Sequence, residues 1–137
     1  MKIFDIMTQK IVINNCYGGF GLSYSAVMRY AELKGIQLHA FIDEISKQVY
    51  KERAVIGNPE ILHHYTTTPN DPNDGYFNEN DIQRDDPILI KVVEEMGETA
   101  NGHCAELKIV EVPDDVKWEI SEYDGAETIE EIHRSWS

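Results

Sequence analysis

The chain of 137 residues contains no long apolar run, and no stretch approaches the roughly 20 apolar residues that a membrane-spanning helix needs. Its first residues also lack the basic stretch, apolar core and small-residue cleavage site of a secretory signal. We therefore expect a protein that acts in the cytoplasm and does not contact a membrane.

Cysteine is also scarce. Cys16 and Cys104 match neither a disulfide nor a zinc spacing, and we expect both to be small buried residues in a reducing compartment. The histidines at His63, His64 and His103 lack the ligand spacing of a zinc site. No metal and no cofactor is expected.

Positively charged residues are also few: the chain has 12 Lys and Arg against 25 Asp and Glu, and its formal net charge is −13. Such a field repels phosphate backbones, so direct binding of nucleic acid is not expected. Between residues 111 and 131 nine acidic residues stand with Lys117 as the one cation. This segment is either a solvated acidic face or a mimic of a nucleic-acid backbone.

The length is that of one domain, 1–137. A β-rich run at 10–14 predicts a strand that stops at a glycine-rich turn. The helical period then begins at Ser23, with Ser23 or Ser25 as N-cap and Gly35 as C-terminal cap. Alternation over 36–42 predicts another strand, so these elements form a βαβ unit.

The middle of the chain combines weak and strong signals. Residues 43–54 weakly predict a helix, and turn-forming residues predict a long surface loop over about 66–85. Asp86 followed by Pro87 is typical of a helix start. The apolar stripe that follows predicts a helix ending at Gly102.

Alternating residues predict strands at 105–111 and 116–120, and Asp124-Gly125 is a hairpin signal. The tail at 126–136 then forms either the antiparallel partner strand or a helix. We therefore expect an α+β fold that combines the βαβ unit with a C-terminal antiparallel hairpin. We expect the strands to form a single mixed sheet with two or three helices packed on it.

The glycine-rich stretch at 18–21 has two interpretations. Glycines beside a helix N-terminus can let an anion approach unpaired N–H groups, but they are equally suited to a tight turn. Tyr24 replaces the third glycine of the dinucleotide fingerprint, and the triphosphate-binding loop motif is absent. No nucleophile signature is present either, which favours a non-catalytic role.

A small anionic, nucleotide-like ligand is the first functional expectation. Backbone amides would hold its charge, aromatic side chains would stack on it, and the basic tail would add charge. The candidate ligand-binding residues are Tyr17, Gly18, Gly19, Phe20, Gly21, Ser23, His133, Arg134 and Trp136.

Four stretches carry a resemblance: INNCYGGFGLS, RDDPILIKVVEEMGE with the ANG that follows, LKIVEVPDDVKWEISEYDG and the terminal HRSW. Together they resemble a family of small proteins encoded by phages and prophages of Gram-positive bacteria. The resemblance implies an accessory protein made in the cytoplasm of an infected host cell, where countering host defence is a common role. It implies no catalytic residue.

Besides the anion-binding protein, an acidic inhibitor that docks a basic groove of a host nucleic-acid enzyme through residues 111–131 is the alternative. A small hydrolase or transferase is a third option that no motif supports. The partner is thus a small anionic molecule or a host protein, and self-association stays open.

Overall fold

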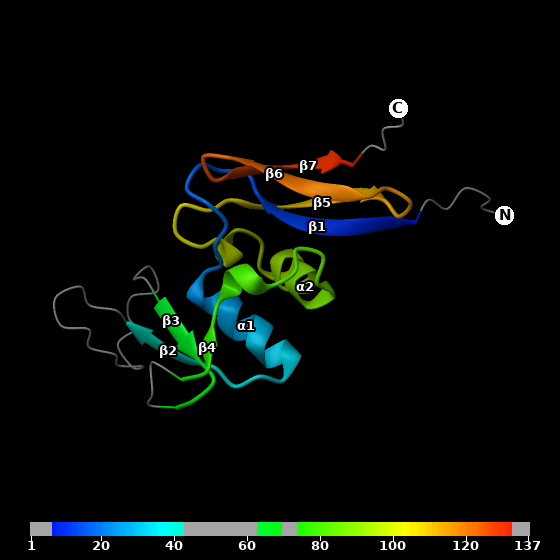
Figure 1. Ribbon diagram of the computed structural model, residues 1–137. Helices are drawn as coiled ribbons and strands as arrows, with labels where there is room; N and C mark the ends of the chain where they lie inside the picture. The colour runs from blue at the N-terminus through cyan, green and yellow to red at the C-terminus, as the bar shows by residue number, and fades with distance from the viewer. Residues whose placement is uncertain (1–6, 43–62, 70–73, 133–137) are drawn as a thin grey trace.

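The computed structural model describes residues 7–42, 63–69 and 74–132, and it confirms the α+β class (Figure 1). These residues contain two α-helices, two 3-10 helices and several short strands. In chain order the elements are β1 (Thr8–Asn14), α1 (Tyr24–Lys34), β2 (His39–Ile42), β3 (His63–Thr66), β4 (Tyr76–Phe77), η2 (Glu79–Asp81), α2 (Pro87–Met96), η3 (Gly97–Ala100), β5 (Leu107–Pro113), β6 (Trp118–Tyr123) and β7 (Ala126–Glu131).

Within the described ranges the strands form three small antiparallel sheets: β1 with β5, β2 with β3 and β4, and β6 with β7. The predictions of a single mixed sheet and of a βαβ unit are therefore wrong, because β1 and β2 share no sheet. The edge of β1 away from β5 forms hydrogen bonds with residues outside β2. Val12 N donates to Arg84 O at 2.8 Å, and Asn14 N donates to Glu127 Oε1 at 2.8 Å.

Helix α1 begins and ends where the sequence predicts. The Ser23 hydroxyl accepts a hydrogen bond from Ala26 N, and Gly35 adopts the left-handed conformation that glycine tolerates at a helix end. The buried side of α1 carries the small and apolar residues that let it pack closely on α2 and η3. These residues are Ala26, Val27, Tyr30 and Ala31.

Helix α2 has the predicted start, since the Asp86 side chain accepts from Ile88 N and Pro87 occupies the first turn. It ends earlier than predicted. Gly97, with φ 59° and ψ −131°, leaves the helical region, and the chain continues as the 3-10 helix η3 instead of running on to Gly102. The predicted apolar stripe is confirmed by the burial of Leu89, Val92, Val93 and Ala100.

Of the two alternatives for the C-terminal tail, the structure shows the strand, over 126–131. Asp124 (φ 52°) and Gly125 (φ 91°) form a tight turn with two positive φ angles, which matches the twist of paired strands. The ladder then brings Ile120 opposite Ile129. The remainder of the predicted tail, 133–136, lies outside the described residues.

The side chains of β1 alternate between its two faces, and each face packs against a different layer. Val12 belongs to the core formed with both helices, whereas Gln9, on the other face, accepts from the Trp118 indole N–H at 3.0 Å. Strands β1, β5, β6 and β7 accordingly lie together, with α1 and α2 beneath them and the β2–β4 sheet at the far side (Figure 1). The β6–β7 hairpin therefore covers the face of β1 that the helices leave open.

The segment 66–85 is more than the predicted surface loop. Its described part contains β4 and η2, and both Thr66 and Ile82 are buried. Arg84 is also largely buried, and it contacts the C-terminal hairpin. The helix predicted over 43–54 lies outside the described residues. Among the helices that are described, none is long and apolar enough to cross a membrane.

Candidate functional site

The glycine turn after β1 is a point of close contact between three chain segments. A Cβ on Gly18 would lie 2.8 Å from the Cβ of Cys104, and one on Gly125 would lie 2.4 Å from Gly19 N. A Cβ on Gly102 would lie 2.6 Å from the carbonyl carbon of Gly21. Only glycine fits such backbone approaches, so packing accounts for Gly18, Gly102 and Gly125. Gly19 has no atom within 4 Å of its Cβ position, and its φ of 99° is the reason that glycine is favoured there.

Several amides of this turn are already hydrogen-bonded within the fold. Gly18 N donates to Asp124 O at 3.3 Å, and Ser23 N donates to Ala100 O at 2.9 Å. Leu22 N donates to the carboxylate of Glu79. Burial raises the pKa of that carboxyl group, while the bond from Leu22 N acts in the opposite direction. These three N–H groups are therefore bonded to protein oxygens and do not face a ligand.

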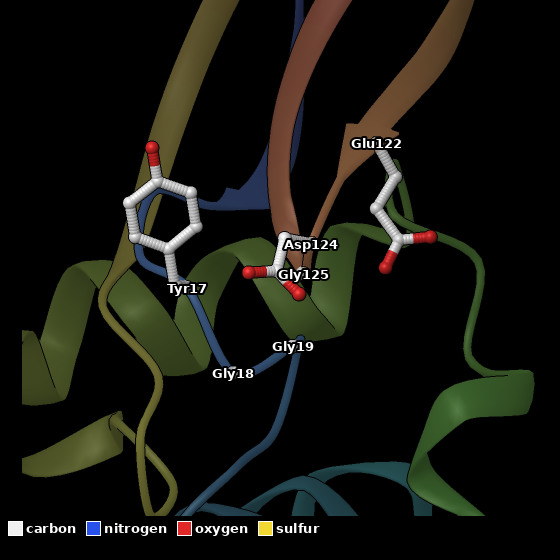
Figure 2. Close-up of a pocket in the computed structure, with 6 residues that line it drawn as sticks. All are labelled: Tyr17, Gly18, Gly19, Glu122, Asp124 and Gly125. Carbon is white, nitrogen blue, oxygen red and sulfur yellow. The ribbon is translucent and has the colours of Figure 1, made fainter.

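Beside the turn lies an open recess of about 600 Å³ (Figure 2). It is lined by Tyr17, Gly18, Gly19, Glu122, Asp124 and Gly125. The Asp124 side chain lies between Tyr17 and Glu122, above the chain at Gly18 and Gly19. Among the residues that the structure describes, two carboxylates and no cationic side chain line this recess. Its charge therefore favours a positive group over a phosphate.

The structure brings together part of the predicted ligand-binding set. Tyr17, Gly18 and Gly19 line the recess. Phe20 lies away from it, with the guanidinium carbon of Arg84 3.7 Å from its ring centroid. The other predicted members divide into two groups. Gly21 packs on Gly102 and Ser23 caps α1, while His133, Arg134 and Trp136 lie outside the described residues.

A buried polar cluster links β1 to the C-terminal hairpin. Arg84 donates to both carboxylate oxygens of Glu127, at 2.6 and 2.9 Å. The fully buried Asn14 donates through Nδ2 to Cys16 O and Gly125 O, each at 2.7 Å, and its Oδ1 accepts from Glu106 N at 2.8 Å. The cluster thus positions both the glycine turn and the hairpin turn that border the recess.

Sequence reasoning missed this cluster. Arg84 lies in a stretch interpreted as loop, and Glu127 stands among nine acidic residues from which nothing in the sequence distinguishes it. Its 7% exposure also corrects the prediction that the whole acidic segment is surface. Asn14 was the one available signal, since a polar residue ends an apolar strand immediately before the turn.

The β6–β7 hairpin presents a second candidate surface. Trp118 and Glu127 point toward β1 and Arg84, so strand alternation directs the other set of side chains outward. We call this set the outer face. It consists of Glu119, Ser121, Tyr123, Ala126, Thr128 and Glu130.

The outer face places two acidic residues opposite each other. Glu119 pairs with Glu130 in the ladder, and both are exposed. No ion pair to either is found within the described part of the chain. Tyr123, at 78% exposure, adds an aromatic ring to the same face. Like charges directly across a ladder repel each other, so this arrangement lowers stability.

The cysteines and possible metal ligands give no further site. Cys16 is half-buried, but Cys104 is exposed, so the prediction of two buried thiols is wrong for Cys104. Its positive φ of 64° places it in the turn that packs against Gly18 rather than in the core. Across 7–42, 63–69 and 74–132 no three His, Cys, Asp or Glu side chains are grouped to hold a metal ion.

No family model, curated protein or solved structure matches this chain. The resemblance to phage-encoded proteins therefore stays a prediction.

Proposed function

We propose that this protein is a non-catalytic binding protein whose acidic C-terminal hairpin docks on a basic surface of a partner protein. The observation that carries the proposal is the exposed pairing of Glu119 with Glu130. A pair of like charges at this position costs about 0.2–1 kcal/mol relative to neutral residues. A cationic partner would turn that repulsion into attraction.

The surroundings of the pair strengthen the same interpretation. Glu122, Asp124, Asp114 and Asp115 are exposed nearby on the hairpin or on the turn that leads into it. Lys117 is the one cation between residues 111 and 131. A negative surface of this kind steers a basic partner toward it and raises the association rate, an effect that salt weakens.

Capture of a small anion at the glycine turn has less support. Glu122 and Asp124 would repel a phosphate in the recess, and the amide of Gly18 is bonded to Asp124 O. We therefore place the acidic docking function first. The resemblance to phage proteins makes a nucleic-acid enzyme of the host, in the host cytoplasm, the expected kind of partner.

The test compares two double variants with the same change in charge. Glu119→Gln with Glu130→Gln neutralises the outer face, whereas Glu95→Gln with Glu98→Gln neutralises two exposed residues on and after α2. Binding to a heptalysine peptide is measured by calorimetry at low and high salt. We expect the hairpin variant to weaken binding about threefold to tenfold and the α2 variant to leave it nearly unchanged.

Equal weakening by both variants would show that the peptide responds only to net charge. The outer face would then be solvated surface without a docking role.

A further inference from the structure

The β6–β7 hairpin is a two-stranded sheet, and its strands differ in their neighbours within the described part of the chain. Strand β7 contacts β1, and the Glu127 carboxylate accepts from Asn14 N at 2.8 Å. Strand β6 pairs with no described strand other than β7. Strand β6 is therefore an edge strand, and edge strands present backbone groups that another chain can pair with.

The ladder shows which backbone groups of β6 face away from β7. Ile132 N donates to Lys117 O at 2.8 Å, which extends the ladder by one hydrogen-bonded pair. Hydrogen-bonded and non-bonded pairs alternate in an antiparallel ladder. Glu119 therefore exchanges bonds with β7, whereas Trp118, Ile120 and Glu122 direct their N–H and C=O groups away from it.

We infer that this free edge of β6 accepts an extended basic segment of the partner as an added antiparallel strand. The inference rests on the proposed function and specifies how the acidic hairpin is recognised. Backbone hydrogen bonds from such a strand give affinity, and its alternating side chains give specificity.

The side chains of β6 define what the added strand must carry. A residue of the added strand opposite Glu119 lies on the outer face, with its Cβ about 5 Å from the Cβ of Glu119, so lysine or arginine is favoured there. An arginine opposite Tyr123 can also stack on that exposed ring. Residues of the added strand opposite Trp118 and Ile120 lie on the other face of the hairpin, beside these two half-buried apolar side chains. The matching segment alternates basic with β-branched apolar residues.

The same charges act against self-association at this edge. An antiparallel pairing of two β6 strands from two copies would place the glutamates of both copies in one ladder, without a cationic side chain from either β6 strand. Charged residues on edge strands are a common protection against such pairing. A basic segment removes the repulsion, so the edge discriminates between a copy of itself and a cationic partner.

The test uses the unchanged protein and a seven-residue peptide in which lysine or arginine alternates with valine. In the inferred register the valine amides donate to β6, and the basic residues direct their amides outward. N-methylation of the valines should therefore weaken binding about tenfold or more, because it removes several hydrogen bonds. N-methylation of the basic residues keeps the charge and should leave the affinity within about threefold.

Hydrogen exchange provides an independent readout. Addition of the unmodified peptide should slow exchange of the amides of Trp118, Ile120 and Glu122. Equal binding of both methylated peptides, absence of this protection, or no binding of the alternating peptide would overturn strand addition.

The outcomes also separate the inference from the proposed function. If both methylated peptides bind alike but the Glu119→Gln, Glu130→Gln variant binds them more weakly, acidic docking stands and strand addition fails. If charge removal on the outer face changes no peptide affinity, the proposed function fails.

Discussion

Arg84 and Glu127 form a two-point ion pair between the segment before α2 and strand β7. Nη1 lies 2.6 Å from Oε1 and Nη2 lies 2.9 Å from Oε2, with side-chain exposures of 16% for Arg84 and 8% for Glu127. The guanidinium also lies over Phe20 and donates to Val12 O at 3.3 Å. One side chain thus connects β1, the glycine turn and the hairpin.

Replacement of Arg84 by methionine should be strongly destabilising. It leaves the Glu127 carboxylate buried without its cation, and breaking a buried pair in this way costs about 3–5 kcal/mol. Urea unfolding measures the change in the free energy of unfolding. The control is Arg29→Met, which breaks the more exposed pair with Glu95 and should cost about 1 kcal/mol or less. Similar losses in both variants would contradict a central role for Arg84.

Gly125→Ala should be more damaging than Gly35→Ala. Both glycines have positive φ angles, 91° and 78°, so both substitutions carry backbone strain. A Cβ at Gly125 would also lie 2.4 Å from Gly19 N, whereas Gly35 has no atom within 4 Å of its Cβ position. We expect an extra loss of about 1–3 kcal/mol for Gly125→Ala, measured by urea unfolding. Equal losses would mean that the two turns are not in close contact.

The double change Glu119→Gln with Glu130→Gln should stabilise the protein at low ionic strength. It removes a like-charge pair across the ladder, so we expect a gain of about 0.2–1 kcal/mol in the free energy of unfolding. The gain should fade as salt approaches about 1 M, where the Debye length is about 3 Å. Thermal unfolding at several salt concentrations measures it. A loss of stability would mean that these carboxylates stabilise the fold.

The carboxyl group of Glu79 should make stability fall with rising pH. Burial raises its folded pKa above the ordinary value of 4.5, so the native state holds the proton more tightly than the unfolded state. Between the unfolded and folded pKa values, each rise in pH therefore lowers the free energy of unfolding. Glu79→Gln removes this dependence, and its amide oxygen can still accept from Leu22 N.

Urea titrations of wild type and Glu79→Gln from pH 4 to 8 measure the effect. We expect the stability of the wild type, relative to the variant, to decrease as pH rises above about 4.5 and then to level off. A constant difference across this range would show that Glu79 ionises as freely in the folded state as in the unfolded chain.

Local signals predicted the elements well. The Ser23 and Asp86 caps, the left-handed Gly35 and the Asp124-Gly125 turn are each determined by a few neighbouring residues, and each occurs where the sequence places it. Such features depend on short-range sterics and on hydrogen bonds between near neighbours. Local chemistry was therefore enough to locate the helix starts and the Asp124-Gly125 turn, but it left both a strand and a helix open for 126–136.

Sheet topology could not be read in the same way. The pairing of β1 with β5 joins residues about 100 positions apart. The sequence of an amphipathic strand does not indicate which other strand it pairs with. The glycine turn illustrates the same limit. Its composition suits an anion-binding turn as well as a tight crossing, and only the positions of Gly102, Cys104 and Gly125 reveal the crossing.

The bond from Asn14 N to Glu127 Oε1 spans 113 positions of the chain. During synthesis, strand β1 emerges long before the residues that pair with it and complete its edge. The nascent chain must therefore keep an apolar strand unpaired while the residues between β1 and β5 are synthesised, and long-range pairing of this kind slows folding. Formation of the native fold consequently depends on the synthesis of β5 and β7, so a chain that stops before them would leave β1 open to aggregation.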